Sequence, residues 1–127
     1  MVRPKHILVV SRDPEMAKVR SRVLTSAGFK VTPAVNIQEL KAALRTEHFD
    51  CALIGYSLPP AEKRRVWSEM NRHRIPTLEL YQGGKAEIPE ATHYRANAPD
   101  DFLTALEKTL KLRVAAKKHP KANRNEG

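Results

Sequence analysis

Short runs of consecutive apolar residues alternate along the chain with longer stretches in which apolar residues recur every three or four positions. Runs this short, without polar residues between their members, predict strands that are buried on both faces of a sheet. We expect strands at 7–10, 29–32, 51–54 and 76–81, and a weaker one at 92–95.

The stretches between these runs predict helices, and capping residues mark where the helices begin and end. Asp13 followed by Pro14 is typical of an N-cap and a first helical position, and Gly28 is typical of a helix stop. Asn36 is a second candidate N-cap. A third helix is expected at 61–71.

A fourth predicted helix follows Pro99, carries two aspartates in its first turn where the helix dipole favours them, and ends before Pro120. The apolar positions that would face the core are Met16, Val19, Val23 and Ala27 in the first helix, Ile37, Leu40 and Leu44 in the second, Val66, Trp67 and Met70 in the third, and Leu103, Leu106, Leu110 and Val114 in the last.

The interval 82–92 breaks this alternation. It contains Gly83, Gly84 and Pro89, and Ile88 is its only large aliphatic residue. A helix of average length, about 11–12 residues, does not fit there together with its two connections. The pattern therefore predicts an α/β fold, a doubly wound five-stranded parallel sheet with helices on both faces, in which the fourth helix is shortened or absent.

Charge divides the chain into one domain at 1–114 and a basic tail at 115–127 that we expect to be disordered. The net charge is +9, and residues 111–127 carry five of these charges. The expected basic patch consists of Lys63, Arg64, Arg65, Lys117, Lys118 and Lys121. Such charge attracts nucleic acid or an acidic protein, or it is a solvated surface that maintains solubility.

Other features of the composition favour a cytoplasmic protein without enzymatic activity. Cys51 cannot form an internal disulfide and lies in an apolar run, so a buried structural role is expected. The five histidines lack metal-ligand spacing. No secretory signal and no apolar stretch of membrane-spanning length is present. We expect no metal, no cofactor and no membrane contact.

In a doubly wound sheet, the functional site lies at the carboxyl ends of the strands. The residues that follow the expected strands are Ser11, Arg12 and Asp13 after the first, Gly55, Tyr56 and Ser57 after the third, Tyr81 at the end of the fourth, and Arg95 near the fifth.

With these residues in place, the segments ILVVSRDPEM, FDCALIGYSLP and IPTLEL resemble the receiver domain of two-component response regulators. The resemblance covers about residues 5–112. It implies an acidic pair that holds Mg²⁺ after the first strand, a phosphoaccepting aspartate at the end of the third, a threonine or serine at the end of the fourth, and a lysine before proline at the fifth.

This sequence departs from that pattern at each chemical position. The acidic pair falls on Ser11 and Arg12, and only the neighbouring Asp13 is acidic. The phosphoacceptor falls on Gly55, the hydroxyl position on Tyr81, and the lysine on Arg95. Because glycine has no side chain and Arg12 repels a metal ion, we expect neither Mg²⁺ binding nor an acyl phosphate.

The cations at these positions raise the possibility of an anion pocket between Arg12 and Arg95. Alternatively, Arg12 pairs with Asp13 and locks the loops. The leading functional hypothesis is a non-phosphorylatable pseudo-receiver that binds a protein partner within a signalling or regulatory system. The alternatives are a nucleic-acid-associated regulator that uses the basic tail, a phospho-responsive receiver, and a sensor of small anions. The oligomeric state stays open.

Overall fold

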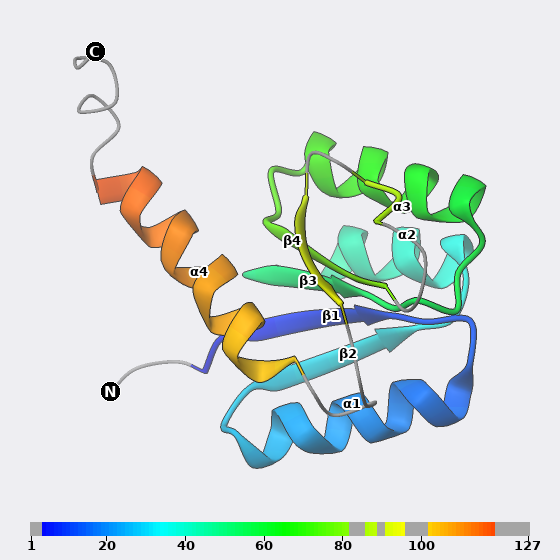
Figure 1. Ribbon diagram of the computed structural model, residues 1–127, viewed down its shortest axis with the longest axis horizontal. Coiled ribbons are helices and arrows are strands. Elements are labelled where there is room, and N and C mark those ends of the chain that lie inside the picture. Colours follow the sequence, from blue (N-terminus) through cyan, green and yellow to red (C-terminus); the bar gives the residue numbers. More distant parts are fainter. Residues whose placement is uncertain (1–3, 82–85, 89–90, 96–101, 119–127) are drawn as a thin grey trace.

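The structure is a computed structural model that describes residues 4–81, 86–88, 91–95 and 102–118 (Figure 1). The strands are β1 (His6–Val10), β2 (Lys30–Ala34), β3 (Cys51–Ile54), β4 (Thr77–Tyr81) and β5 (Thr92–Arg95). The helices within the described residues are α1 (Pro14–Ser26), α2 (Ile37–Thr46), α3 (Pro60–Arg72) and α4 (Leu103–Lys118). In that part of the chain, no helix has the length and apolar character that a membrane crossing requires.

All five strands form one parallel sheet in the order β2-β1-β3-β4-β5. Every residue of β1 and β3 is buried, as expected for central strands that are covered on both faces. Helices α2 and α3 cover one face, and α1 and α4 cover the other (Figure 1). The predicted doubly wound α/β fold is confirmed.

Local signals placed the helix ends correctly. The Asp13 side chain accepts hydrogen bonds from the backbone amides of Glu15, at 3.0 Å, and Met16, at 3.4 Å. Asn36 Oδ1 accepts from the Glu39 amide at 2.8 Å. Gly28 has a φ of 94°, a left-handed value that glycine adopts without strain.

The inward face of α1 differs from the prediction by one residue. The buried residues are Ala17, Arg20 and Leu24, whereas Ala27 is exposed and the other predicted positions are only partly buried. The helix is turned so that Arg20 lies over the carboxyl end of β3, where Gly55 provides room for it. A charged residue therefore occupies the position that an apolar one was expected to fill.

Two further boundaries differ. Strand β2 spans Lys30–Ala34 rather than 29–32, and it includes Pro33, which an edge strand tolerates because one of its sides needs no hydrogen bond. Helix α4 continues to Lys118, four residues into the segment that we assigned to the tail. The rest of that tail, with Lys121 and Pro120, lies outside the described residues, as do Pro99 and the two aspartates that follow it.

The structure describes only part of the interval between β4 and β5, where the alternating pattern would otherwise require a helix. Residues 86–88 and 91, the part of this interval that the structure describes, are not helical. Ile88 is fully buried and packs into the core cluster on the α2 and α3 face. The described residues of this interval thus cover the sheet through Ile88 and are irregular, in agreement with the expected shortening or absence of the fourth helix.

Candidate functional site

The loops that follow β1 and β3 meet at the carboxyl edge of the sheet. Ser11 is buried, and its Oγ lies 3.3 Å from Ser57 Oγ. The same hydroxyl accepts a hydrogen bond from the Asp13 amide at 3.2 Å. The position at which the receiver resemblance places a metal-binding carboxylate therefore holds a hydroxyl that ties two loops together.

Gly55, the residue on which the receiver resemblance places the phosphoacceptor, packs against an arginine from α1. A Cβ atom on Gly55 would lie 2.4 Å from Arg20 Nη1, closer than real Cβ contacts allow. Arg20 is 0% exposed and is among the largest fully buried side chains in the described part of the protein. Arg20 can therefore be buried here because Gly55 has no side chain in the space that the guanidinium occupies.

Arg20 keeps its charge in an unusual environment. Its three guanidinium nitrogens make no hydrogen bond within the described residues. The guanidinium carbon lies 5.0 Å from the centre of the Tyr56 ring, within range of a cation–π interaction. Burial lowers the pKa of Arg20, while Tyr56 and Asp13 act in the opposite direction. Because an arginine titrates far above neutral pH, the group is a buried cation.

Arg12 finds a different partner from the one expected. Its Nη1 lies 3.3 Å from Glu62 Oε1 on α3, and its side chain is 48% exposed. Asp13, the alternative partner, instead uses its carboxylate to cap α1. The loop after β1 is still held in place, but by α3 rather than by its own neighbour. Since the pair is exposed, its contribution to stability is small.

Tyr81 and Arg95 lie away from this cluster. They are register partners on the neighbouring strands β4 and β5. Two strands separate β5 from β1, which corresponds to about 14 Å between the outer pair at the usual strand spacing. Arg12 and Arg95 therefore start from distant strands, and the anion pocket between them stays a prediction.

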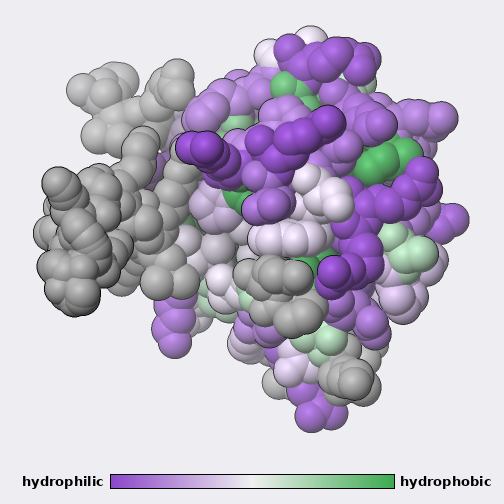
Figure 2. All heavy atoms as spheres, turned by 90° about the horizontal axis from the view of Figure 1, so that it is seen from above, coloured by the Kyte–Doolittle hydropathy of each residue, from purple (hydrophilic) through white to green (hydrophobic). Residues whose placement is uncertain are grey.

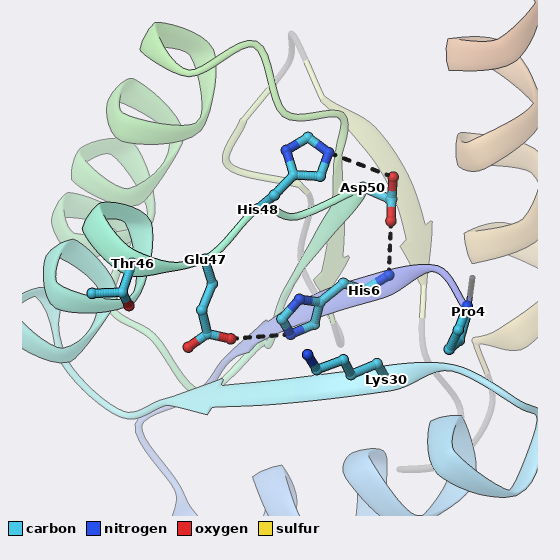
Figure 3. A pocket seen from close by; sticks show the side chains of 7 residues that line it. All are labelled: Pro4, His6, Lys30, Thr46, Glu47, His48 and Asp50. Atoms are coloured by element: carbon cyan, nitrogen blue, oxygen red, sulfur yellow. Dashed lines mark hydrogen bonds and ion pairs between the residues drawn. The ribbon is translucent and has the colours of Figure 1, made fainter.

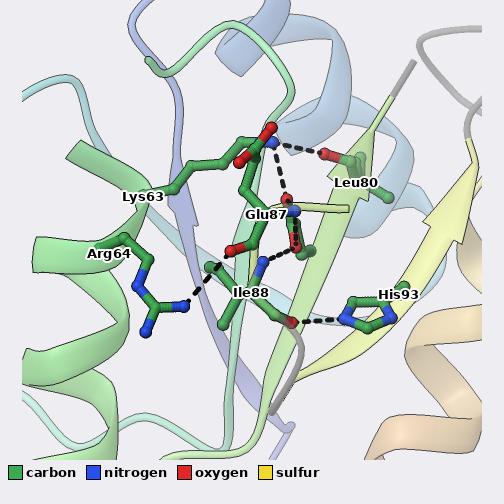
Figure 4. A network of polar contacts seen from close by, with 7 residues as sticks. Lys63, Arg64, Leu80, Glu87, Ile88 and His93 are labelled. Atoms are coloured by element: carbon green, nitrogen blue, oxygen red, sulfur yellow. Dashed lines mark hydrogen bonds and ion pairs between the residues drawn. The ribbon is translucent and has the colours of Figure 1, made fainter. Parts of the chain in front are cut away.

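The assignment of Lys63 to an exposed basic patch is wrong. Its side chain is 4% exposed, and Nζ lies 2.8 Å from Oε2 of Glu79, which is 0% exposed (Figure 4). Lys63 Nζ also donates to the carbonyl of Leu80 at 3.4 Å. Arg64 and Arg65 are exposed, as expected. The side chain of Lys63 turns inward because a carboxylate lies in the middle of β4.

Glu79 also holds residues 87 and 88, part of the interval in which the fourth helix was expected to be shortened or absent. Its carboxylate accepts hydrogen bonds from the amides of Glu87 and Ile88, at 2.9 Å and 2.8 Å (Figure 4). His93 contacts the Ile88 carbonyl from β5. Burial alone would raise the pKa of Glu79, but Lys63 and the two amides hold this pKa below its ordinary value. The carboxylate is ionised and fully engaged.

This pair was not predicted, although the sequence contains a signal for it. Strand β4 reads Thr-Leu-Glu-Leu-Tyr, and a charged residue within a strand that is covered on both faces requires a partner. The basic neighbours of Lys63 in sequence favour an exposed position. Its helical spacing from the core residues Val66 and Met70 instead predicts that it faces the core.

A cavity at the opposite edge of the sheet was also not predicted. It has a volume of about 480 Å³ and is lined by Pro4, His6, Lys30, Thr46, Glu47, His48 and Asp50 (Figure 3). The His6 amide donates to Asp50 Oδ2 at 2.8 Å, and His6 Nε2 lies 3.3 Å from Glu47 Oε1. These polar groups pair with one another, so they do not indicate a ligand of a particular kind.

Other expectations concern single residues. Cys51 is buried and carries no disulfide, and Met70 is fully buried while Trp67 packs at the edge of the core, all as predicted. The described residues contain no group of three histidine, cysteine, aspartate or glutamate side chains that could hold a metal ion. Lys117 and Lys118 belong to the last turn of α4.

Comparisons with known proteins identify the fold. No protein-family model matches the chain, and no curated protein matches it by sequence. Solved structures do match. A CheY-like response regulator receiver domain protein from Methanospirillum hungatei JF-1 is 20% identical, with a TM-score of 0.73 over 89% of this chain and 98% of that chain.

Two further structures agree. The N-terminal domain of a response regulator/sensory box/GGDEF 3-domain protein from Carboxydothermus hydrogenoformans is 18% identical, with a TM-score of 0.72 over 87% of this chain and 98% of that one. The signal receiver domain of an HD domain-containing protein from Pseudomonas fluorescens Pf-5 is 14% identical, with a TM-score of 0.75 over 89% and 99%. At these identities the likeness establishes the receiver fold.

Steric coupling between Gly55 and Arg20 can be measured. Gly55 does not have a left-handed φ, so Gly55→Ala adds only a methyl group against Arg20. We expect this substitution to lower the free energy of unfolding by about 1–3 kcal/mol in the wild-type background, and by clearly less with Arg20→Ala present. Urea denaturation of the wild type, both single variants and the double variant provides the test. Additive effects would contradict the proposed contact.

The Lys63–Glu79 pair predicts a large effect of removing one partner. Lys63→Met leaves a buried carboxylate without its cation, and we expect a loss of about 3–5 kcal/mol in the free energy of unfolding. Lys63→Met combined with Glu79→Gln should recover most of it, because the amide still accepts from the backbone. Arg65→Met, at an exposed position on the same helix, is the control and should change stability by less than about 0.5 kcal/mol.

His6 predicts how stability depends on pH. Burial lowers its pKa from the ordinary value of 6.5, although Glu47 partly opposes the shift. The unfolded chain therefore binds a proton at a pH where the folded chain does not, and stability falls as the pH drops below 6.5. Thermal unfolding between about pH 7.5 and 5.5 should show this loss, and His6→Gln should flatten it. An unchanged slope in the variant would exclude His6 as the cause. Glu79 does not interfere, since its pKa lies below 4.5.

Proposed function

We propose that this receiver-fold domain takes no phosphoryl group and acts by binding a protein partner in a signalling or regulatory assembly of the cytoplasm. The observation that carries the proposal is the guanidinium of Arg20 in the space beside Gly55. A group that cannot accept phosphate, packed against a fixed cation, has replaced the reactive carboxylate that the resemblance implies.

The chemistry of phosphoryl transfer supports this proposal. An acyl phosphate requires a carboxylate nucleophile, and Gly55 supplies none. Mg²⁺ prefers hard oxygen ligands, usually one or two carboxylates with water. Here the loop after β1 offers the Ser11 hydroxyl, the Arg12 cation and a carboxylate on Asp13 that already caps α1. Arg12 and Arg20 both add positive charge near the place where a metal ion would sit.

The contacts around the edge also favour a domain with one fixed conformation. The hydroxyls of Ser11 and Ser57 join the loops after β1 and β3, and Arg12 joins the first of these loops to α3. Glu79 and Lys63 fix the segment after β4. A domain of this kind serves as a binding surface rather than as a switch, and we propose no catalytic role for it.

The nucleic-acid alternative has less support than the sequence suggested. Lys63, one of the expected basic-patch residues, is buried and neutralised by Glu79. Arg64 donates to the carbonyl of Glu87, and Arg65 is exposed. The net charge of +9 is still sufficient to attract a polyanion at low salt. Protein binding is therefore the better-supported function, and nucleic acid remains the alternative to be tested.

Exposure to a small phosphodonor tests the proposal. The full chain is incubated with acetyl phosphate and Mg²⁺, and intact-protein mass spectrometry should find no added phosphoryl group, because there is no carboxylate at Gly55 to accept one. A receiver domain that retains its aspartate is the positive control. Stoichiometric labelling that hydroxylamine removes would overturn the proposal, since that sensitivity is characteristic of an acyl phosphate.

A further inference from the structure

The two helices on one face of the sheet, α2 and α3, lie side by side and leave a seam between them (Figure 1). The seam is hollowed at one end by a cavity of about 190 Å³, which is lined by Lys41, Leu44, Arg45, Glu69, Arg72 and His73. A smaller hollow at the other end is lined in part by Ile37, Glu62 and Arg65. The face that Figure 2 views from above is mostly hydrophilic, with small separate hydrophobic patches.

Positive charge exceeds negative charge along this seam. Its two acidic residues are already paired, since Glu62 lies 3.3 Å from Arg12 and Glu69 lies 2.7 Å from Arg72. Lys41, Arg45 and Arg65 are exposed and form no ion pair among the described residues. The unpaired charge on both walls of the seam is therefore positive.

The floor of the seam is apolar. Ile37 and Leu44 are only partly buried, and both pack against the core cluster beneath α2. They are seven residues apart, so they lie on the same side of α2 and about 10.5 Å apart along its axis. Lys41 lies between them in sequence, and Arg45 follows. The seam thus combines two apolar contact points with a basic rim over two helical turns.

We propose that the α2–α3 seam binds an acidic amphipathic segment of a protein partner. This inference rests on the proposed function and specifies the surface and the chemistry of the partner. An acidic helix with apolar residues on one side would place these residues over Ile37 and Leu44, and its carboxylates beside Lys41, Arg45 and Arg65. Nucleic acid would engage the cations but would leave the apolar floor unused. The seam is distinct from the edge that carries Gly55 and Arg20.

The two parts of the surface contribute differently to binding. Exposed charges accelerate association and make the affinity depend on salt. Contact with Ile37 and Leu44 removes apolar surface from water and is much less sensitive to salt. Binding at the seam should therefore weaken with added salt but persist at physiological ionic strength, provided that the partner presents its apolar residues on one side.

Fluorescence anisotropy with defined probes tests the inference. One probe is a labelled peptide of glutamate, alanine and leucine with the leucines at helical spacing, and the second is the same composition in scrambled order. A labelled DNA duplex is the third. We expect the amphipathic peptide to bind the full chain about tenfold more tightly than the scrambled peptide at physiological salt, a difference of about 1.4 kcal/mol. Equal affinity of the two peptides would overturn the proposal.

Matched charge reversals locate the binding site. Lys41→Glu with Arg45→Glu reverses two exposed cations that lie four residues apart on α2, and Lys18→Glu with Arg22→Glu makes the same change on α1. Both variants have the same net charge. The first should weaken binding of the amphipathic peptide about tenfold, and the second should have little effect. Circular dichroism melts confirm that both variants fold. Equal losses in the two variants would show that only net charge matters and would overturn the proposal.

The DNA probe distinguishes the occupants. The duplex could bind the full chain more tightly than the amphipathic peptide does, and the α2 variant could lose that affinity. This result would show that the seam binds nucleic acid rather than an acidic protein segment, and it would overturn the inference. The phosphodonor experiment is independent of all these results. Phosphoryl labelling by acetyl phosphate would refute the proposed function even if the peptide binds. If the peptide does not bind, the result of the labelling experiment is unaffected.

Discussion

The burial of Arg20 against Gly55 is the constraint on which the carboxyl edge of this domain depends. A guanidinium without hydrogen bonds inside a protein is unfavourable unless other interactions offset its lost hydration. Here the Tyr56 ring lies 5.0 Å away, and the charge of Asp13 at the start of the same helix favours the cation. The long side chain also fills space next to a residue that has none. Any side chain at Gly55 would have to displace Arg20. The packing of α1 is therefore coupled to the conformation of the loop after β3.

Lys63 is a second buried cation, and its lost hydration is offset in a different way. Lys63 pairs with Glu79, and the remaining oxygen capacity of that carboxylate is used by two backbone amides. These amides belong to residues 86–88, which lie between β4 and β5 and are not helical. A helix satisfies its own backbone groups, whereas an irregular covering segment requires partners from outside. The Glu79 carboxylate thus serves both Lys63 and the non-helical residues 87 and 88, and these hydrogen bonds offset the desolvation cost of the ion pair.

Much of the fold could be predicted from the sequence because its signals are local. Apolar runs located the strands, and Asp13, Asn36 and Gly28 located helix ends through their own backbone contacts. The site was predicted only in part, because its chemistry depends on whether each charged side chain faces the core or the solvent. Arg20 and Lys63 both belong to amphipathic helices, and periodicity assigns a charged residue to the surface by default. Only the neighbours in space, Gly55 and Glu79, show why these two residues turn inward.

The proposed loss of the phosphoryl site has a consequence for how such a domain would be regulated. A ligand shifts a conformational equilibrium only by its difference in affinity for the two states. Under the proposed function no acyl phosphate forms, so the carboxyl edge would provide no such difference, and the Ser11–Ser57, Arg12–Glu62 and Glu79–Lys63 contacts hold the loops together there. Under this proposal, control would act on the amount of the domain or on its partner. Partner affinity would then not need to be coupled to that edge, which is consistent with placing the proposed binding surface at the α2–α3 seam.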